Sequence, residues 1–277
     1  MVGYAIHMTM LYLWALLAIA LSLCVLMAFA FLVQQRTGNS GWVDTIWTFA
    51  VGLVGAGSAL WPIAGAAPNA RQGLVAALVA IWSLRLGLHI AVRTAGISDD
   101  PRYASFAKEW GFNAPRRMFM FLQNQALGSI PLAFAIFVAA RFPDDELRWQ
   151  DALGALILFV GIAGEALADF QLKRFRTDPT NKGRVCHAGL WRWSRHPNYF
   201  FEWFCWLAYP VIGLSFDYPL TYPWGLATLL APVFMYWILV YVTGIPPLEE
   251  QMLRSRGDRY RAYQSRTSKF FPLPPSA

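Results

Sequence analysis

The sequence predicts an all-α, polytopic integral membrane protein with seven transmembrane helices. Composition is the first observation: 57% of the 277 residues are hydrophobic and only 14% are charged, whereas soluble domains carry about a quarter charged residues. The second observation is a series of long apolar runs. The third is an uneven distribution of Lys and Arg between the segments that connect these runs. Together they predict a multi-pass chain whose membrane-spanning segments are helices.

Each apolar run has close to the roughly 20 residues that a spanning helix needs. The seven runs cover about 10–33, 42–63, 73–92, 118–140, 151–168, 199–215 and 223–243. The sixth run is the shortest and begins inside a polar stretch. We therefore expect its first turns to border a cavity in the protein instead of lipid.

Lys and Arg gather in alternate connections. The connections after the first, third and fifth runs, together with the C-terminal tail, hold nineteen of them. The opposite connections, including the one near Asp217, hold only Arg71, Arg141 and Arg148. Because cytoplasmic loops are enriched in these residues, we expect the C-terminus in the cytoplasm and the N-terminus outside. The longest cytoplasmic connections, which we expect to carry the function, are about 93–117, 169–198 and 244–277.

Several classes of protein are excluded. The net charge of +7 suits an anionic partner, but nucleic acid is not expected because the cations fall in short connections between apolar runs. The cysteines fit neither a disulfide framework nor a zinc pattern, and we expect no metal. They are Cys24, Cys186 and Cys205. The first apolar run is too long for a signal peptide.

Charged side chains within apolar runs need an explanation, because each costs roughly 2.5–3.5 kcal/mol on insertion scales. These residues are Asp44, Arg85, Glu165, Asp169 and Glu202. His89 lies one turn beyond Arg85, on the same helix face. Such groups either pair within the helix bundle, for example Asp44 with Arg85, or line a polar cavity that opens to the cytoplasm.

Asp44 itself has two interpretations. It follows Asn39 and Ser40, which are typical N-cap residues, so it lies in the early turns of a helix, where the helix dipole favours its charge. It is equally suited to be a catalytic carboxylate just below the membrane surface, at the deep end of the cavity. The local pattern supports both interpretations.

The segment 169–203 is the most polar and most basic part of the chain. Its cations suit phosphate groups, Asn181 and Asn198 suit amide or ribose contacts, and Asp169 suits a ribose hydroxyl. The cations are Lys173, Arg174, Arg176, Lys182, Arg184, Arg192 and Arg195, and the rings on which a base could stack are Trp191, Trp193 and Tyr199. The segment therefore predicts a nucleotide cofactor.

Two features limit this prediction. The chain has no Gly-rich Rossmann or P-loop signature, so a dinucleotide would bind in another way. The segment could instead touch anionic lipid headgroups. The run Arg195-His196-Pro197-Asn198-Tyr199 argues against lipid, because attraction to lipid needs cations but not this mixture of side chains.

These residues resemble the steroid 5α-reductase family, and the chain is similar to its bacterial membrane branch. The resemblance rests on Asn181-Lys182-Gly183, Gly189-Leu190-Trp191, Arg195-His196-Pro197-Asn198-Tyr199, Glu202-Trp203 and the tail from Glu249-Glu250 to Phe271-Pro272. The related sterol Δ14-reductases share the run at 195–199. The resemblance is strong over about 165–272, weaker over 40–103, and implies a place in the bacterial inner (cytoplasmic) membrane.

The resemblance implies NADPH-dependent reduction of the C4–C5 double bond of a 3-oxo-Δ4 steroid or a similar enone lipid. Residues 1–277 would then form a single membrane domain that acts as a monomer, with the substrate at 1–117 and the cofactor at 118–277. The partners would be the lipid substrate and the surrounding membrane lipids.

The resemblance also implies roles for single residues. Two arginines, Arg102 and Arg176, match residues of the family that contact the phosphates of NADPH. Asp169 matches a residue that contacts its adenosine. Asn198 and Glu202 match the residues at its nicotinamide end. The cofactor contacts expected in all are Arg102, Asp169, Lys173, Arg176, Asn181, Lys182, Arg195, His196, Asn198, Tyr199, Glu202 and Glu250. The expected catalytic residues are Asp44, His89 and Glu202.

The chain also departs from the family pattern. The eukaryotic reductases place a Gln-Glu pair and a Tyr around the substrate carbonyl, whereas Asp44 is the acid available here and the third span has no Tyr. Asp44 would either donate a proton or, ionised, orient a donor such as His89. A tail His of those enzymes is replaced here by Glu249 or Glu250.

The strongest alternative is a membrane methyltransferase of the isoprenylcysteine or phospholipid type, which uses S-adenosylmethionine. That group resembles the chain in the Arg-His-Pro-x-Tyr run and the Glu-Glu tail. Asn198, Glu202 and the cations of 173–184 argue against it, because S-adenosylmethionine has no phosphate to neutralise. A third hypothesis is a non-enzymatic lipid-binding protein, in which the charges at membrane depth are purely structural.

Overall fold

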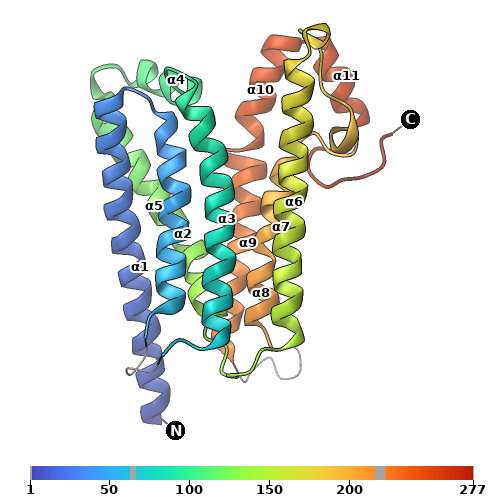
Figure 1. Ribbon diagram of the computed structural model, residues 1–277. Helices are drawn as coiled ribbons and strands as arrows, with labels where there is room; N and C mark the ends of the chain where they lie inside the picture. Colours follow the sequence, from blue (N-terminus) through green and yellow to red (C-terminus); the bar gives the residue numbers. More distant parts are fainter. Residues whose placement is uncertain (1, 63–66, 216–221, 277) are drawn as a thin grey trace. The chain divides into compact units, whose positions relative to one another are not determined.

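The computed structural model describes residues 2–62, 67–215 and 222–276, and every regular element in these ranges is helical (Figure 1). The chain divides into two compact units. The first contains Met1–Arg148 and Ile212–Leu230, and the second contains Trp149–Val211 and Ala231–Ala277. Asp217, which enters the orientation prediction, and residue 63, the predicted end of the second span, lie outside the described residues.

The first unit contains long helices and shorter elements near their ends. The long helices are α1 (Val2–Thr37), α2 (Gly41–Leu60), α3 (Ala70–Ala95) and α5 (Ala114–Ala139). The shorter elements are α4 (Pro101–Trp110), η1 (Gly111–Asn113) and η4 (Pro223–Leu229). α8 (Ala208–Gly213) crosses the boundary between the units.

The helices of the first unit pack through small residues. α2 contacts α1, α3 and α5. A Cβ atom added at Gly52 would lie 2.2 Å from the Oγ atom of Ser83 on α3, and this hydroxyl donates to the Thr48 carbonyl oxygen at 3.0 Å. Close approach at small residues and interhelical hydroxyl bonds are typical of helices that associate in membranes.

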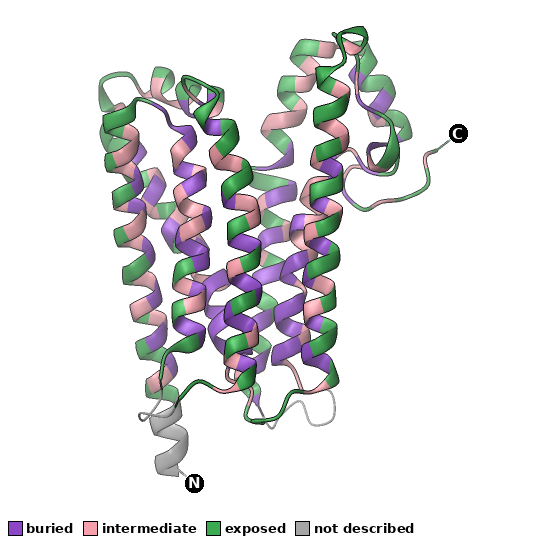
Figure 2. Ribbon diagram, in the orientation of Figure 1, coloured by how far each residue is buried: buried purple, intermediate pink, exposed green. Residues whose placement is uncertain are grey.

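The faces of α1 differ in burial but not in polarity. Buried Tyr12, Leu23 and Met27 recur at helical spacing, whereas Leu21 and Val25 are exposed (Figure 2). Large apolar side chains on the exposed face would be unfavourable in water over so long a helix. They are expected where that face contacts lipid.

The arginines expected outside the membrane hold loops of the first unit in place. Arg71 is fully buried and donates to the Phe142 carbonyl oxygen at 3.2 Å. The guanidinium carbon of Arg148 lies 3.4 Å from the centre of the Phe142 ring, and Arg141 donates to the Trp61 carbonyl oxygen at 2.8 Å. These contacts satisfy backbone carbonyls at the helix ends.

The second unit begins with a long helix and ends with two short ones. The helices longer than one turn are α6 (Trp149–Thr177), α7 (Pro197–Trp206), α9 (Leu230–Trp237), the π-helical η5 (Ile238–Val242), α10 (Ile245–Arg256) and α11 (Asp258–Arg266). The single turns η2 (Pro179–Asn181) and η3 (Gly189–Arg192) lie between α6 and α7. α10 begins at Ile245, and the diproline of residues 246–247 lies in its first turn.

Glycines bring α7 onto α6. A Cβ atom added at Gly161 would lie 2.4 Å from the Sγ atom of Cys205, and one added at Gly164 would lie 2.3 Å from the Phe201 ring. Later residues of α7 therefore meet earlier residues of α6, and the two helices run antiparallel.

The C-terminal tail lies beside the segment that precedes α7. The backbone N–H of Arg195 donates to the Ser268 carbonyl oxygen at 2.8 Å, and that of Leu273 donates to the Trp193 carbonyl oxygen at 3.1 Å. The Ser194 hydroxyl donates to the Phe270 carbonyl oxygen of the tail at 2.8 Å. The tail is thus part of the structure that holds the start of α7.

Within the described residues, six helical segments are long and apolar enough to cross a membrane, which supports a multi-pass membrane protein. They are Thr9–Thr37, Gly41–Leu60, Ala70–Ala95, Pro101–Ala139, Trp149–Thr177 and Pro223–Arg256. The run at 199–215, predicted as the sixth of seven spans, is divided between α7 and α8. Pro210 explains the division, because it has no N–H to bond the carbonyl oxygen of Trp206. The orientation of the termini stays a prediction.

The structure extends the fifth predicted span. The apolar run ends at residue 168, but α6 continues to Thr177, so Asp169, Lys173 and Arg176 are helical residues and not loop residues. Hydropathy marks where a helix leaves the apolar environment, whereas the helix itself ends where its hydrogen bonding ends.

Candidate functional site

The two units are described separately, and the second holds most of the residues predicted to contact a cofactor. Asp169 of α6 accepts a hydrogen bond from the Asn198 side-chain amide of α7 at 3.3 Å. One turn beyond Asn198, Glu202 is buried and accepts a hydrogen bond from the Trp206 indole N–H at 3.0 Å. The antiparallel packing of α6 and α7 therefore brings together residues predicted for the ribose and the nicotinamide.

Arg195 and His196 face the C-terminal helices. Oε1 of Glu249 on α10 accepts a hydrogen bond from Nε of Arg195 at 2.6 Å and lies 3.2 Å from Nε2 of His196. The same atom accepts from the Tyr260 hydroxyl at 3.3 Å, and Oε2 accepts from the Gln264 amide at 3.0 Å. Glu249 thus connects the start of α7 to α10 and α11.

Burial and charge act in opposite directions on His196. Removal from water lowers the pKa of the imidazole, and the neighbouring Glu249 carboxylate partly offsets this effect. The ring also stacks on Tyr199, with centroids 5.8 Å apart. Arg195, His196 and Tyr199 therefore form a packed support for the N-terminus of α7.

The two tail glutamates differ sharply. Glu250, the residue predicted to contact the cofactor, has a side chain that is 63% exposed and pairs with Arg254 one turn later. The Glu249 side chain is 14% exposed and has the partners described above. Glu249 lies one turn after the buried Ile245 on the same helix face, which is the sequence signal that distinguishes it from Glu250.

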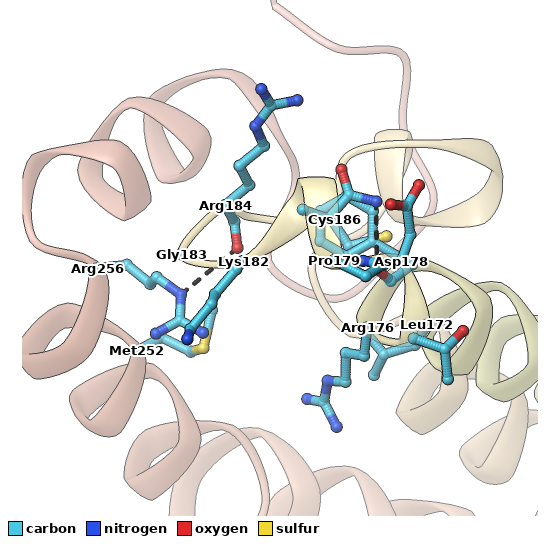
Figure 3. Close-up of a pocket in the computed structure, with 13 residues that line it drawn as sticks. Leu172, Arg176, Asp178, Pro179, Lys182, Gly183, Arg184, Cys186, Met252 and Arg256 are labelled. Atoms are coloured by element: carbon cyan, nitrogen blue, oxygen red, sulfur yellow. Dashed lines mark hydrogen bonds between the residues drawn. The ribbon is translucent and has the colours of Figure 1, made fainter.

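A pocket of about 420 Å³ lies at the C-terminal end of α6. Its walls are the end of α6, the connection that contains η2, and the last turns of α10. The basic residues that line it are Arg176, Lys182, Arg184 and Arg256. Arg176, Lys182 and Arg256 surround the opening, whereas the Arg184 side chain extends away from it (Figure 3).

The connection around η2 is fixed by its own hydrogen bonds. Asp178 accepts from the backbone N–H and the hydroxyl of Thr180, at 2.9 and 2.7 Å, and these bonds lower the pKa of its carboxyl group. The Asn181 side chain donates to the Phe175 carbonyl oxygen at 3.2 Å and so closes the end of α6. Asn181 lines the pocket but also has this structural role.

Other predicted residues take positions around this region. Lys173 is exposed on α6 and is not among the pocket residues. Cys186, in contrast, is a buried pocket residue. Burial raises the pKa of its thiol above the ordinary value.

The first unit holds a second polar cluster. Asp44 forms an ion pair with Arg102, whose guanidinium also contacts Asp100 at 2.9 Å. The Tyr103 hydroxyl donates to the other carboxylate oxygen of Asp44 at 2.8 Å and accepts from the Gln125 amide at 3.2 Å. The structure thus places the predicted catalytic acid, Asp44, beside the predicted phosphate contact, Arg102.

His89 lies on α3, and its position on that helix is exposed. Two residues of these clusters were not predicted from the sequence as site residues: Tyr103, whose hydroxyl contacts Asp44, and Arg256, which lines the pocket. Tyr103 was visible as the neighbour of Arg102. Arg256 lies seven residues after Glu249, at a spacing that places both on one face of a helix.

Comparisons with known proteins agree with the membrane assignment but give no activity. A family described as "Protein of unknown function (DUF1295)" matches residues 30–267. An uncharacterized protein of Schizosaccharomyces pombe is 34% identical over 100 residues, which are 36% of this chain and 27% of the yeast protein. The chain therefore matches about a quarter of the length of that relative. No solved structure matches.

Proposed function

Because the chain belongs to the DUF1295 family of membrane proteins, which sits in the steroid reductase-like superfamily, we propose that it is an NADPH-dependent reductase. Its substrate would be an enone lipid, such as a 3-oxo-Δ4 steroid, and the reaction would reduce the carbon–carbon double bond by hydride transfer within the membrane. The proposal draws on the family resemblance and on the polar groups of the second unit.

The observation that carries the proposal is the basic pocket at the end of α6. A pocket of about 420 Å³ lies within the range of roughly 300–1,000 Å³ that is usual for small-molecule sites. Among the described residues that line it, four are cations and Asp178 carries the one carboxylate. An excess of cations around a pocket favours a ligand with several phosphate groups.

The positions along α6 fit an extended dinucleotide. Asp169, with Asn198 bound to it, lies seven residues before Arg176, or about 10 Å along the helix axis. Gly164, which meets Phe201 next to Glu202, lies about 18 Å from Arg176 along the same axis. The polar groups and the cations proposed to contact the cofactor therefore follow one another along the length of α6.

We assign the following roles to residues of the chain in binding the cofactor. Bound NADPH would supply a hydride from its nicotinamide ring. Arg176 and Lys182 would neutralise its phosphates, while Asp169 holds the Asn198 amide in one orientation and Trp206 holds the Glu202 carboxylate. These fixed side chains can orient a bound ring without reorganising during the reaction.

Proton supply is assigned to Asp44 and Tyr103 of the first unit. The Asp44 carboxyl group forms an ion pair with Arg102. A carboxylate that accepts from a hydroxyl fixes the direction of that hydroxyl. We therefore propose Tyr103 as the donor, whose single hydroxyl proton would turn from Asp44 to the substrate oxygen, and Asp44 as the group that holds this hydroxyl beforehand, in place of the predicted pair of Asp44 and His89.

The test is turnover by the full-length protein purified in detergent. NADPH oxidation should depend on an added 3-oxo-Δ4 steroid or another enone lipid and should yield the saturated ketone, identified by mass spectrometry. NADPH that binds without any enone-dependent oxidation across a panel of steroid and isoprenoid enones would contradict the reductase. Binding of S-adenosylmethionine in place of NADPH would favour a methyltransferase instead.

A further inference from the structure

Arg256 is the pocket residue that comes from the C-terminal helices. It lies at the end of α10, whereas Arg176 and Lys182 come from the end of α6 and the connection after it (Figure 3). Its Nε donates to the Arg184 carbonyl oxygen and its Nη1 to the Ser255 carbonyl oxygen, both at 3.4 Å. These bonds are long, so an anion could replace them at little cost.

The connection that carries Lys182 is held in place beside Arg256. Gly183 has a φ angle of +77°, in the left-handed region that favours glycine. Its carbonyl oxygen accepts from Nη1 of Arg259 on α11 at 3.1 Å. Both Lys182 and Arg256 are therefore presented by backbone that hydrogen bonds hold in a defined arrangement.

The pocket lies at the far end of the residues proposed to bind the dinucleotide. Glu202, predicted for the nicotinamide, lies near Gly164, about 18 Å along α6 from Arg176. Asp169, predicted for the adenosine side, lies between them. A dinucleotide with its nicotinamide near Glu202 would bring the other end, the adenosine, to the pocket.

The charge of the pocket distinguishes the two kinds of phosphate in the cofactor. A phosphate monoester carries about −1.5 to −2 charges at neutral pH and three acceptor oxygens, whereas each phosphate of the pyrophosphate bridge carries one charge. Cations that approach from three backbone segments suit a terminal group that can be contacted from several sides. In NADPH that group is the 2′-phosphate of adenosine, which NADH lacks.

We infer that Arg256 and Lys182, facing Arg176, bind the 2′-phosphate of adenosine and make the protein select NADPH over NADH. This inference rests on the proposed function, because it assumes that the second unit binds a nicotinamide dinucleotide. Arg256 is then a specificity-determining residue supplied by the C-terminal helix α10. Arg184, whose side chain points away, contributes its backbone carbonyl oxygen.

The test is a pair of binding isotherms, one with NADPH and one with NADH, on the full-length protein in detergent. We expect Arg256→Ala to raise the Kd for NADPH on the order of tenfold to a hundredfold, as loss of a charge-assisted hydrogen bond implies. The Kd for NADH should stay within about twofold. Lys182→Ala should act in the same direction, and Arg256→Lys should retain part of the selectivity.

Arg254→Ala is the matched control. It removes the same charge from the same helix, but Arg254 is 78% exposed and pairs with Glu250. It should change neither Kd. A second comparison uses 2′-AMP and 5′-AMP as competitors for NADPH, and we expect 2′-AMP to compete more strongly.

The outcomes separate this inference from the proposed function. If the wild-type protein binds neither dinucleotide, both fail. If Arg256→Ala weakens the binding of NADPH and of NADH equally, the pocket binds the pyrophosphate. This inference then fails, while the proposed reductase function still holds. Unchanged NADPH binding in Arg256→Ala also overturns the inference. So does displacement of NADPH by phosphatidylglycerol in mixed micelles as efficiently as by 2′-AMP, because the pocket would then hold a lipid headgroup.

Discussion

Asp44 shows how a single residue depends on partners that are distant in the sequence. Its ion-pair partner Arg102 and its hydrogen-bond partner Tyr103 lie 58 and 59 positions later. The sequence placed Asp44 in the early turns of a helix, and α2 confirms this position. It could not reveal that Asp44 holds the hydroxyl of a tyrosine, because that contact depends on how α4 packs.

The first prediction concerns this hydroxyl. Tyr103→Phe removes one oxygen atom and should lower kcat for enone reduction by at least about a hundredfold, the usual effect of losing a general acid. The Kd for NADPH should stay within about twofold, because the cofactor-binding cations lie in the second unit. Rates are measured by NADPH absorbance and affinities by titration.

Tyr241→Phe is the control for this prediction. Tyr241 is 60% exposed, so loss of its hydroxyl should leave both quantities unchanged. A Tyr103→Phe variant with wild-type turnover would remove Tyr103 from the mechanism and return the proton to another donor.

Cys186 reports on the pocket through its thiol. Burial raises its pKa, so less thiolate is present at any given pH, and alkylation by a maleimide should accelerate only as the pH rises beyond the ordinary thiol value. NADPH should protect the thiol, because Cys186 lines the pocket. The rate is followed by intact-mass spectrometry in a Cys24→Ala, Cys205→Ala background. Fast alkylation at pH 7 that NADPH does not slow would contradict the assignment of the pocket.

At the scale of elements, α10 and α11 hold the segment that leads into α7. The connection runs through Glu249, whose carboxylate accepts bonds from Arg195 and Tyr260. We expect Glu249→Gln to lower the free energy of unfolding by about 2 kcal/mol, because it leaves a largely buried guanidinium without its counter-charge. Thermal unfolding in detergent measures this change.

Glu250→Gln provides the comparison one residue away. Glu250 is exposed and pairs with Arg254 in an i, i+4 arrangement, so its substitution should change the stability by about 0.5 kcal/mol or less. Equal destabilisation by the two substitutions would show that the contacts of Glu249 contribute no more to the free energy of unfolding than an exposed ion pair does.

The bounds of the helices could be predicted only in part from the sequence. Hydropathy located the apolar part of α6 but not its continuation to Thr177, because the last turns are basic and amphipathic. It merged α7 and α8 into one span, although Pro210 interrupts the hydrogen bonding between them.

At the scale of the whole chain, composition was sufficient for the helical, multi-pass membrane fold. The alternation of apolar runs and basic connections requires no knowledge of tertiary contacts. The candidate site was only partly predictable. Arg176 and Lys182 lie in the basic segment 169–203, whereas Arg256 joins them because the end of α10 lies beside the connection that follows α6.

The cations of the chain have different structural roles, which the sequence alone does not distinguish. Arg71, expected outside the membrane, is fully buried and bonded to loop carbonyls. Arg176 and Lys182 instead line a pocket. The positive charge of the sequence thus has at least two physical causes, and only the pocket cations bear on a cofactor.

The central claim is that the cations at the end of α6 bind the phosphates of NADPH, and titration of the full-length protein with NADPH tests it most directly. We predict saturable binding that Arg176→Ala weakens by about tenfold or more. Arg174→Ala, which removes an exposed charge two residues earlier and outside the pocket, should leave the Kd unchanged. Absence of saturable NADPH binding, or equal weakening by both substitutions, would contradict the claim.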